Sequence, residues 1–369
     1  MRRLMLLTAL TVWMVPAAGE GAQLLSGTDV PARAAGASEV DETASPAGTG
    51  APAGLAEKSA LAQQGRTPAA APRPSPTRRR GSMVGYIDDA TVESKVRIRL
   101  DSGFGTTAPD RAEFFYAKCG CYSGLPHDHP AYDADAPGPQ PGSADDLNFQ
   151  QFVVEAEFAL GSRASVFGLM PLRWLQPQSF VPGTGGSFPN QSGFGDLRAG
   201  VKLGLADTAT AGVTAKVQFY FPTGDSQKGM GTNHGTVEPA VLFHNSLSKL
   251  VDLESQIGVW LPIGGSASVP TAADGKFAGN VFYYGIGPSF TVYERNRVRF
   301  GPVVELVGWH VMSGNESVGL DASGSNIVNL KIGGRLNYGD GSIYVGYGHA
   351  LTDKVWYDDI VRFEYRYAF

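Results

Sequence analysis

The chain ends, over residues 355–369, with the stretch VWYDDIVRFEYRYAF. Apolar and charged residues alternate there with a period of two, which puts the two sets on opposite faces of a β-strand. One face carries Arg362, Glu364 and Arg366. The other face is interrupted only by Asp359 and is otherwise apolar or aromatic: Val355, Tyr357, Val361, Phe363, Tyr365, Tyr367 and Phe369. The stretch predicts a strand whose two faces meet very different surroundings.

Similar runs fill the chain after residue 82 and predict about twelve strands. They span 92–100, 151–159, 164–175, 197–205, 211–221, 236–245, 251–262, 281–293, 297–311, 327–338, 342–350 and 355–369. With 48 Gly and 18% charged residues the chain is unlike a helical enzyme, and 43% hydrophobic residues exclude disorder throughout. The net charge of −5 argues against a nucleic-acid partner.

Connection lengths distinguish a membrane barrel from a soluble sandwich, which the alternation alone would also fit. Short connections at 161–163, 207–209, 246–248, 294–296 and 339–341 alternate with long ones at 101–146, 176–192, 222–235, 263–278 and 312–325. Only 352–354 is short where a long loop is expected. Tight turns at one end and long loops at the other are typical of outer-membrane barrels. We therefore predict an all-β fold, a transmembrane antiparallel up-and-down β-barrel.

Outward-facing aromatic residues are expected at two levels, as in the interfacial girdles of membrane barrels. The periplasmic level would hold Phe158, Phe290, Tyr338, Tyr367 and Phe369, and the outer level Trp174, Phe219, Phe221, Phe282 and Tyr284. The ending of the chain also resembles the terminal-strand signal read by the barrel-assembly machinery. That resemblance implies that Tyr365, Tyr367 and Phe369 form an assembly signal.

The N-terminal part divides into an export signal and a tether. Residues 1–22 have a positive start at Arg2 and Arg3 and an apolar core, followed by small residues, as in a signal peptide. Residues 23–82 are rich in Ala, Pro and Gly without apolar periodicity and predict a disordered tether. Residues 83–369 would form the barrel. The predicted location is the outer membrane of a Gram-negative-type cell.

Two motifs carry a resemblance to a known family. They are GFGDLRAGVK at 193–202 and FPTGD at 221–225, the latter followed by GMGT at 229–232. They resemble the outer-membrane transporters named after the meta pathway of phenol degradation, with Phe221 at a position where the family has leucine. The resemblance implies passage of small, often aromatic or otherwise apolar, compounds across the outer membrane.

Charged side chains on the inward faces are the candidate site. The pore-lining candidates are Arg97, Arg99, Glu155, Glu157, Arg198, Lys202, Lys216, Glu238, Glu254, Arg297, Arg299, Glu305, Lys331, Arg335, Arg362, Glu364 and Arg366. These residues either pair across strands and fill the interior or line an open pore, since twelve strands is an intermediate width. An open pore with this excess of bases would favour anions. The loop at 101–146 could fold inward as a constriction.

A Cys/His cluster lies in the first long loop. Cys119, Cys121, His127 and His129 are residue types that bind zinc or copper, but a local disulfide or plain packed thiols are the alternatives. No metal or other cofactor is predicted. The partners expected are outer-membrane lipid and lipopolysaccharide, the barrel-assembly machinery and small-molecule solutes.

Enzymatic activity is not predicted. A lipid hydrolase would need a cooperating triad, and His244 and Asn245, being adjacent on a strand, point to opposite faces. His310 is expected to face the lumen. The alternatives to a channel are a closed structural or surface-presenting barrel and, more remotely, an outer-membrane hydrolase.

Overall fold

A computed structural model describes most of the chain after residue 80. The described residues are 81–107, 127–128, 138–142, 144–180, 182–183, 186–263, 278–317, 320–321, 323–352 and 356–369. The predicted signal peptide, residues 23–80 of the predicted tether and most of the first long loop lie outside this part. No helix within it is long and apolar enough to cross a membrane.

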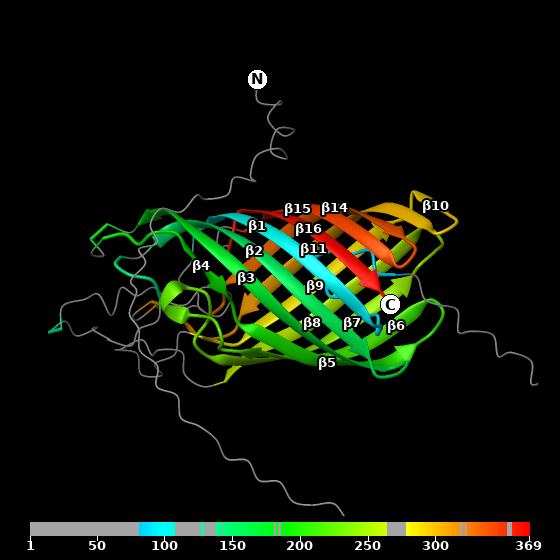
Figure 1. Ribbon diagram of the computed structural model, residues 1–369, viewed down its shortest axis with the longest axis horizontal. Helices are drawn as coiled ribbons and strands as arrows, with labels where there is room; N and C mark the ends of the chain where they lie inside the picture. The colour runs from blue at the N-terminus through cyan, green and yellow to red at the C-terminus, as the bar shows by residue number, and fades with distance from the viewer. Residues whose placement is uncertain are drawn as a thin grey trace, which may run out of the picture. The chain divides into compact units, whose positions relative to one another are not determined.

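Twelve antiparallel strands form one closed barrel (Figure 1). Each strand pairs with the next one along the chain, and pairing of the first strand with the last closes the ring. The strands are β1 (Lys95–Thr106), β2 (Ala144–Ala159), β3 (Ala164–Phe180), β5 (Leu197–Asp207), β6 (Ala211–Phe221), β7 (Gly235–Ser246), β8 (Val251–Ile263), β9 (Val281–Phe290), β11 (Val298–Val311), β14 (Asn326–Tyr338), β15 (Gly341–Ala350) and β16 (Asp359–Ala368). The predicted fold class is confirmed.

Shorter elements decorate the barrel. β4 (Gln191–Phe194) pairs with Leu172–Leu175 of β3, and β10 (Tyr293–Arg295) forms a hairpin with β11. β12 (Asn315–Ser317) and β13 (Leu320–Asp321) pair with each other, and η2 (Ser226–Lys228) is a single 3-10 turn.

The two ends of the barrel differ as predicted. The short-turn end holds the connections at 160–163, 208–210, 247–250, 291–297 and 339–340, together with the start of β1 and the C-terminus. The opposite, long-loop end holds the connections after β1, β3, β6, β8 and β11. Both termini of the barrel therefore leave from one end.

The faces of the strands separate apolar from charged side chains. On β16, Phe363 and Tyr367 are 45% and 47% exposed, whereas Glu364 between them is fully buried inside. The same outward exposure recurs around the ring, for example at Val201, Ile257 and Ile332. An exterior of large apolar side chains around a charged interior is stable only when the exterior meets lipid.

The predicted segment boundaries need three corrections. Residues 92–94 precede β1 instead of forming its start, and Gly81 and Ser82 are not part of a tether, because all five lie in an ordered segment described below. The last strand begins at Asp359, and Tyr357 points inward, where its hydroxyl accepts a hydrogen bond from Lys331 at 2.7 Å. Val355 lies outside the described residues.

Candidate functional site

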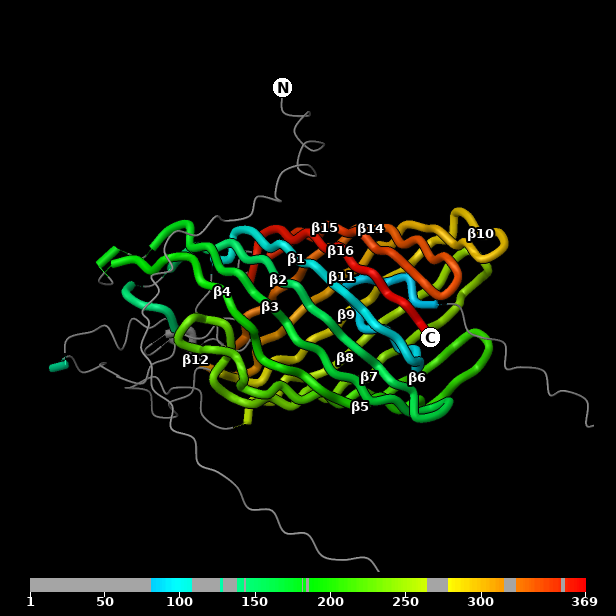
Figure 2. Tube along the Cα trace, in the orientation of Figure 1, coloured from blue at the N-terminus to red at the C-terminus, as the bar shows by residue number. Residues whose placement is uncertain are grey.

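Residues 81–94, which we name the plug segment, lie inside the barrel (Figure 2). They form neither strand nor helix and bend at 85–87. Met83, Val84 and Ile87 are at most 1% exposed, and they pack on Val303, Val307 and Tyr344 of the barrel wall.

The plug segment enters and leaves at the short-turn end. At its start, the carbonyl of Gly81 accepts a hydrogen bond from Arg299 near the beginning of β11. At its end, the carbonyl of Ser94 accepts one from the N–H of Phe369. Between them, the Tyr86 ring reaches up to Lys331 and Arg362, whose charged groups lie 4.1 and 4.0 Å from its centre. The segment is thus a re-entrant loop with Tyr86 near its tip.

Carboxylates of the wall bind the N–H groups of the plug segment. Glu305 accepts from the three successive N–H groups of Gly85, Tyr86 and Ile87 at 2.8–2.9 Å. Glu254 accepts from Met83 at 2.8 Å. Irregular backbone inside a barrel must find such partners, because a buried unpaired N–H is costly.

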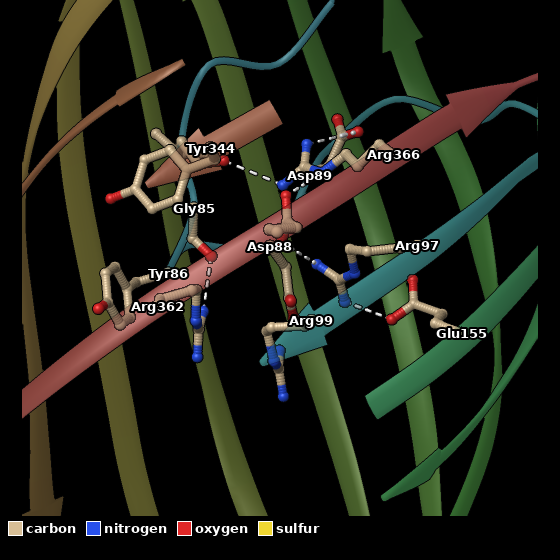
Figure 3. A network of polar contacts seen from close by, with 12 residues as sticks. Gly85, Tyr86, Asp88, Asp89, Arg97, Arg99, Glu155, Tyr344, Arg362 and Arg366 are labelled. Atoms are coloured by element: carbon tan, nitrogen blue, oxygen red, sulfur yellow. Dashed lines mark hydrogen bonds and ion pairs between the residues drawn. The ribbon is translucent and has the colours of Figure 1, made fainter. Parts of the chain in front are cut away.

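Bases of the wall bind the carbonyl groups of the same segment, and Figure 3 shows this for Arg362 and Gly85. Arg335 donates to Met83 and Val84 at 3.0 and 2.7 Å, and Arg362 donates to Gly85 at 2.6 Å. Further donors to plug carbonyls are Arg366, Lys202 and Thr214. Charged groups of the wall therefore bind both the N–H and the carbonyl groups of the plug backbone.

Two aspartates of the plug segment add ion pairs. Asp89 is buried and lies 2.7 Å from the ammonium of Lys95 and 3.6 Å from Arg366. Asp88 pairs with Lys216. Burial alone would raise the pKa of Asp89, but Lys95 and Arg366 outweigh it and hold that pKa well below the usual range.

Wall residues also pair with one another across strands. Glu364 accepts a hydrogen bond from Arg335 and forms an ion pair with Arg366, each at 2.6 Å, and Lys202 lies 2.9 Å from Glu157. Glu155 pairs with Arg97, and Glu238 with Lys216. Some charged residues of the wall, such as Arg335 and Lys216, therefore bind both the plug segment and other residues of the wall.

All but one of the predicted pore-lining residues face the lumen. These are Arg97, Arg99, Glu155, Glu157, Arg198, Lys202, Lys216, Glu238, Glu254, Arg299, Glu305, Lys331, Arg335, Arg362, Glu364 and Arg366. Arg297 is the exception, because β11 begins one residue later and its exposed side chain pairs with Asp340 in the neighbouring turn. Its position in a turn, outside the alternating strand, explains the wrong assignment.

A cavity of about 160 Å³ remains in the lumen beside Tyr86, and is called here the lumen cavity. Arg99, Asp101, Lys331 and Arg362 contribute charged groups to its wall. Aromatic side chains line it as well, including Trp309, which stacks edge-on against Trp356.

The other predicted candidates are not assembled into a site in the described part. Cys119, Cys121 and His129 lie outside it, His127 is exposed, and the described residues contain no group of metal-ligating side chains. Tyr365, Tyr367 and Phe369 point outward at the short-turn end, and their role in assembly stays a prediction.

The histidines differ from expectation. His310 does not face the lumen, because Trp309 and Val311 take the inward positions of β11, and its ring bonds Asn326. His244 Nε2 lies 3.4 Å from the Ser246 hydroxyl, a same-face contact two residues apart on one strand. That hydroxyl also donates to Asp252, so Ser246 lies between the histidine and the aspartate. In a hydrolytic triad the histidine lies between the serine and the aspartate.

Part of the chain matches a known family profile. Residues 143–260 match the profile described as "Putative MetA-pathway of phenol degradation", which spans both sequence motifs. The matched region contains the motifs that carry the predicted resemblance. No curated protein matches the sequence.

Several solved structures are similar to this chain. An outer membrane channel from Pseudomonas putida is 11% identical, with a TM-score of 0.49, covering 78% of this chain and 99% of its own. LpxR from Salmonella typhimurium is 10% identical with a TM-score of 0.40, covering 75% of this chain and 100% of its own. The beta domain of the Bordetella autotransporter BrkA is 12% identical with a TM-score of 0.43, at coverages of 75% and 100%.

Proposed function

We propose that the chain is an outer-membrane channel for small molecules, closed by its own plug segment and opened when that segment withdraws. The observation that supports the proposal is that many charged groups of the wall form hydrogen bonds with the backbone of the plug segment and not only with one another. Glu305 and Arg335 bind plug backbone, and the plug segment is joined to the barrel covalently only through β1.

A permanently closed barrel would not need this arrangement. Its wall charges could be neutralised across neighbouring strands alone, or replaced by side chains that pack. Here the carboxylate of Glu305 and the guanidinium of Arg362 would face the lumen when the plug segment leaves, and water could solvate both. A charged interior that is stable when wet is typical of barrels that conduct.

Other parts of the proposal rest on the exterior and on the family. The apolar outer surface supports insertion into outer-membrane lipid, with export by residues 1–22 and assembly through the last strand. The family description supports solutes related to aromatic degradation. No enzymatic step is part of the proposal.

Gly85 provides the test. A Cβ atom built at Gly85 would lie 2.2 Å from the ring of Tyr344, which is fully buried, so Gly85→Val prevents seating of the plug segment. In planar lipid bilayers we expect Gly85→Val to conduct at least tenfold more often than the unaltered chain. The strands of the barrel are untouched by this change.

Gly81→Val is the matched control within the same segment. A Cβ atom at Gly81 would meet nothing within 4 Å, so this variant should stay closed like the unaltered chain. Both variants must show heat-modifiable gel mobility, which reports a folded barrel. If Gly85→Val and a deletion of residues 82–91 both fold and neither conducts, the chain is a closed structural barrel.

A further inference from the structure

The lumen cavity has room for one small ring. Its volume is about 160 Å³, and a cavity of about 150 Å³ in another protein accommodates benzene. Tyr86 of the plug segment lies on one side, and Trp309 and Tyr357 add aromatic surface. Such walls favour a flat aromatic ligand through stacking and edge contacts.

The charge balance of this cavity is positive. Arg362 binds Asp101 through two nitrogens at 2.6 and 3.0 Å, and Arg99 reaches the same carboxylate at 3.1 Å. One carboxylate therefore serves two guanidinium groups. Arg198 also lines the cavity, and its guanidinium carbon lies 4.4 Å from the centre of the Tyr220 ring.

Lys331 is a buried base in the wall of the lumen cavity. Its side chain is 1% exposed, and its ammonium donates to the hydroxyl of Tyr357 at 2.7 Å. The rings of Tyr86 and Tyr357 are its other neighbours, at 4.1 and 4.9 Å. Within the described residues no carboxylate lies within 4 Å of this nitrogen. Asp101 and Glu305 act on this ammonium only from beyond 4 Å. A buried ammonium with no carboxylate in contact is unfavourable, and an anion bound beside it would offset that cost.

We propose that the lumen cavity binds a small aromatic carboxylate, with its charge at Lys331 and its ring against the aromatic wall. The inference deepens the proposed function, because it names the class of solute that the channel holds. A neutral ring would leave the ammonium unpaired, and a simple anion would leave the aromatic surface unused. The combination of both groups in one ligand satisfies the cavity.

Calorimetric titration of the full folded chain in detergent tests this inference. Benzoate is the probe, with phenol as the ring without a carboxylate and acetate as the carboxylate without a ring. We expect benzoate to bind at least tenfold more tightly than either. Lys331→Met should lower benzoate affinity at least tenfold, whereas Lys331→Arg, which keeps the charge, should retain most of it.

Lys228→Met serves as the control, since Lys228 lies in an exposed loop with its side chain 57% exposed, and it should bind benzoate normally. The absence of benzoate binding by the folded chain overturns the inference, as does equal affinity for phenol. Binding is measured without conduction. If Gly85→Val conducts but the unaltered chain does not bind benzoate, the proposed ligand is wrong and the proposed channel function stands.

Discussion

Single carboxylates hold the plug segment by its backbone. Glu305 accepts three consecutive N–H groups, and the Tyr344 hydroxyl donates to it at 3.1 Å as well. Hydrogen bonds to a charged acceptor contribute about 1.5–3 kcal/mol each, more than bonds between neutral groups. The seat of the plug is therefore sensitive to individual charges on the wall.

Asp89 predicts how the closed state responds to acid. The pKa of Asp89 lies well below its ordinary value of 3.8, mainly because Lys95 and Arg366 outweigh the effect of burial. A carboxylate with a lowered pKa stabilises the docked state above its ordinary pKa, and this contribution is lost as pH falls through the lowered value. Conductance of the unaltered chain should therefore stay low from about pH 7 to about pH 5 and rise only below about pH 4.

Asp89→Asn checks the cause. This variant loses the charge at every pH, so it should open more often than the unaltered chain already at neutral pH, with a docking loss of about 1.5–3 kcal/mol. Conductance that rises between about pH 7 and about pH 5 in the unaltered chain would contradict the prediction. Such a rise would point to a histidine instead of Asp89.

The strands predict a depth-dependent cost for charges on the outer face. Val345 is 51% exposed near the middle of β15, and Tyr338 is 70% exposed at the short-turn rim. Val345→Arg should lower the free energy of unfolding from lipid by about 2–4 kcal/mol, and Tyr338→Arg by about 0–1 kcal/mol. Denaturant unfolding of the refolded protein in lipid vesicles measures both. Equal, small losses would mean that this face does not meet hydrocarbon.

Elements with a period of two were predictable, and the plug segment was not. Alternation placed Arg362, Glu364 and Arg366 in the lumen because inward and outward positions in a membrane strand differ in solvent. The same rule failed for Arg297 and Tyr357, which lie just outside strands, where parity no longer fixes direction. The family motifs at 193–202 and 221–225 fall on strands and turns within the matched region.

The plug segment has no periodicity to reveal it. Residues 81–94 read GSMVGYIDDATVES, and the only local signal is the short apolar run from Met83 to Ile87 next to a polar stretch. Its partners, such as Glu254 and Arg335, lie more than 160 residues away along the chain. Contacts of that separation depend on closure of the whole ring, which local sequence does not encode.

At the scale of the whole molecule, opening should be reversible and controllable by a covalent lock. A Cβ atom built at Gly287 would lie 2.9 Å from Cγ1 of Val84, so the two positions face each other, and cysteines there would meet after a small shift of Ile87 and Glu305, which lie 3.0 Å from the same Cβ. We expect the double variant Val84→Cys with Gly287→Cys, made with Cys119 and Cys121 replaced by serine, to lose all openings on oxidation. Reduction should restore the openings of the unaltered chain.

The reduced double variant is the control for any effect of the substitutions themselves. Mass spectrometry of the oxidised protein establishes that the bond has formed. Oxidised protein that opens as often as reduced protein would show that conduction does not require movement of the plug segment. The disulfide should hold the plug segment in the lumen, whereas Gly85→Val should displace it.

The plug segment enters and leaves at the short-turn end of the barrel. A pulling force on the chain just before Gly81 would therefore act on the contacts of the plug segment one after another and not on all of them together. The bond from Arg299 to Gly81 would rupture first, then those at Met83 and Val84, then the cluster at Glu305, and the ion pairs of Asp88 and Asp89 last. Peeling bonds one after another needs far less force than shearing them simultaneously. A small pulling force from the short-turn end would therefore withdraw the plug segment while the strands of the barrel stay paired.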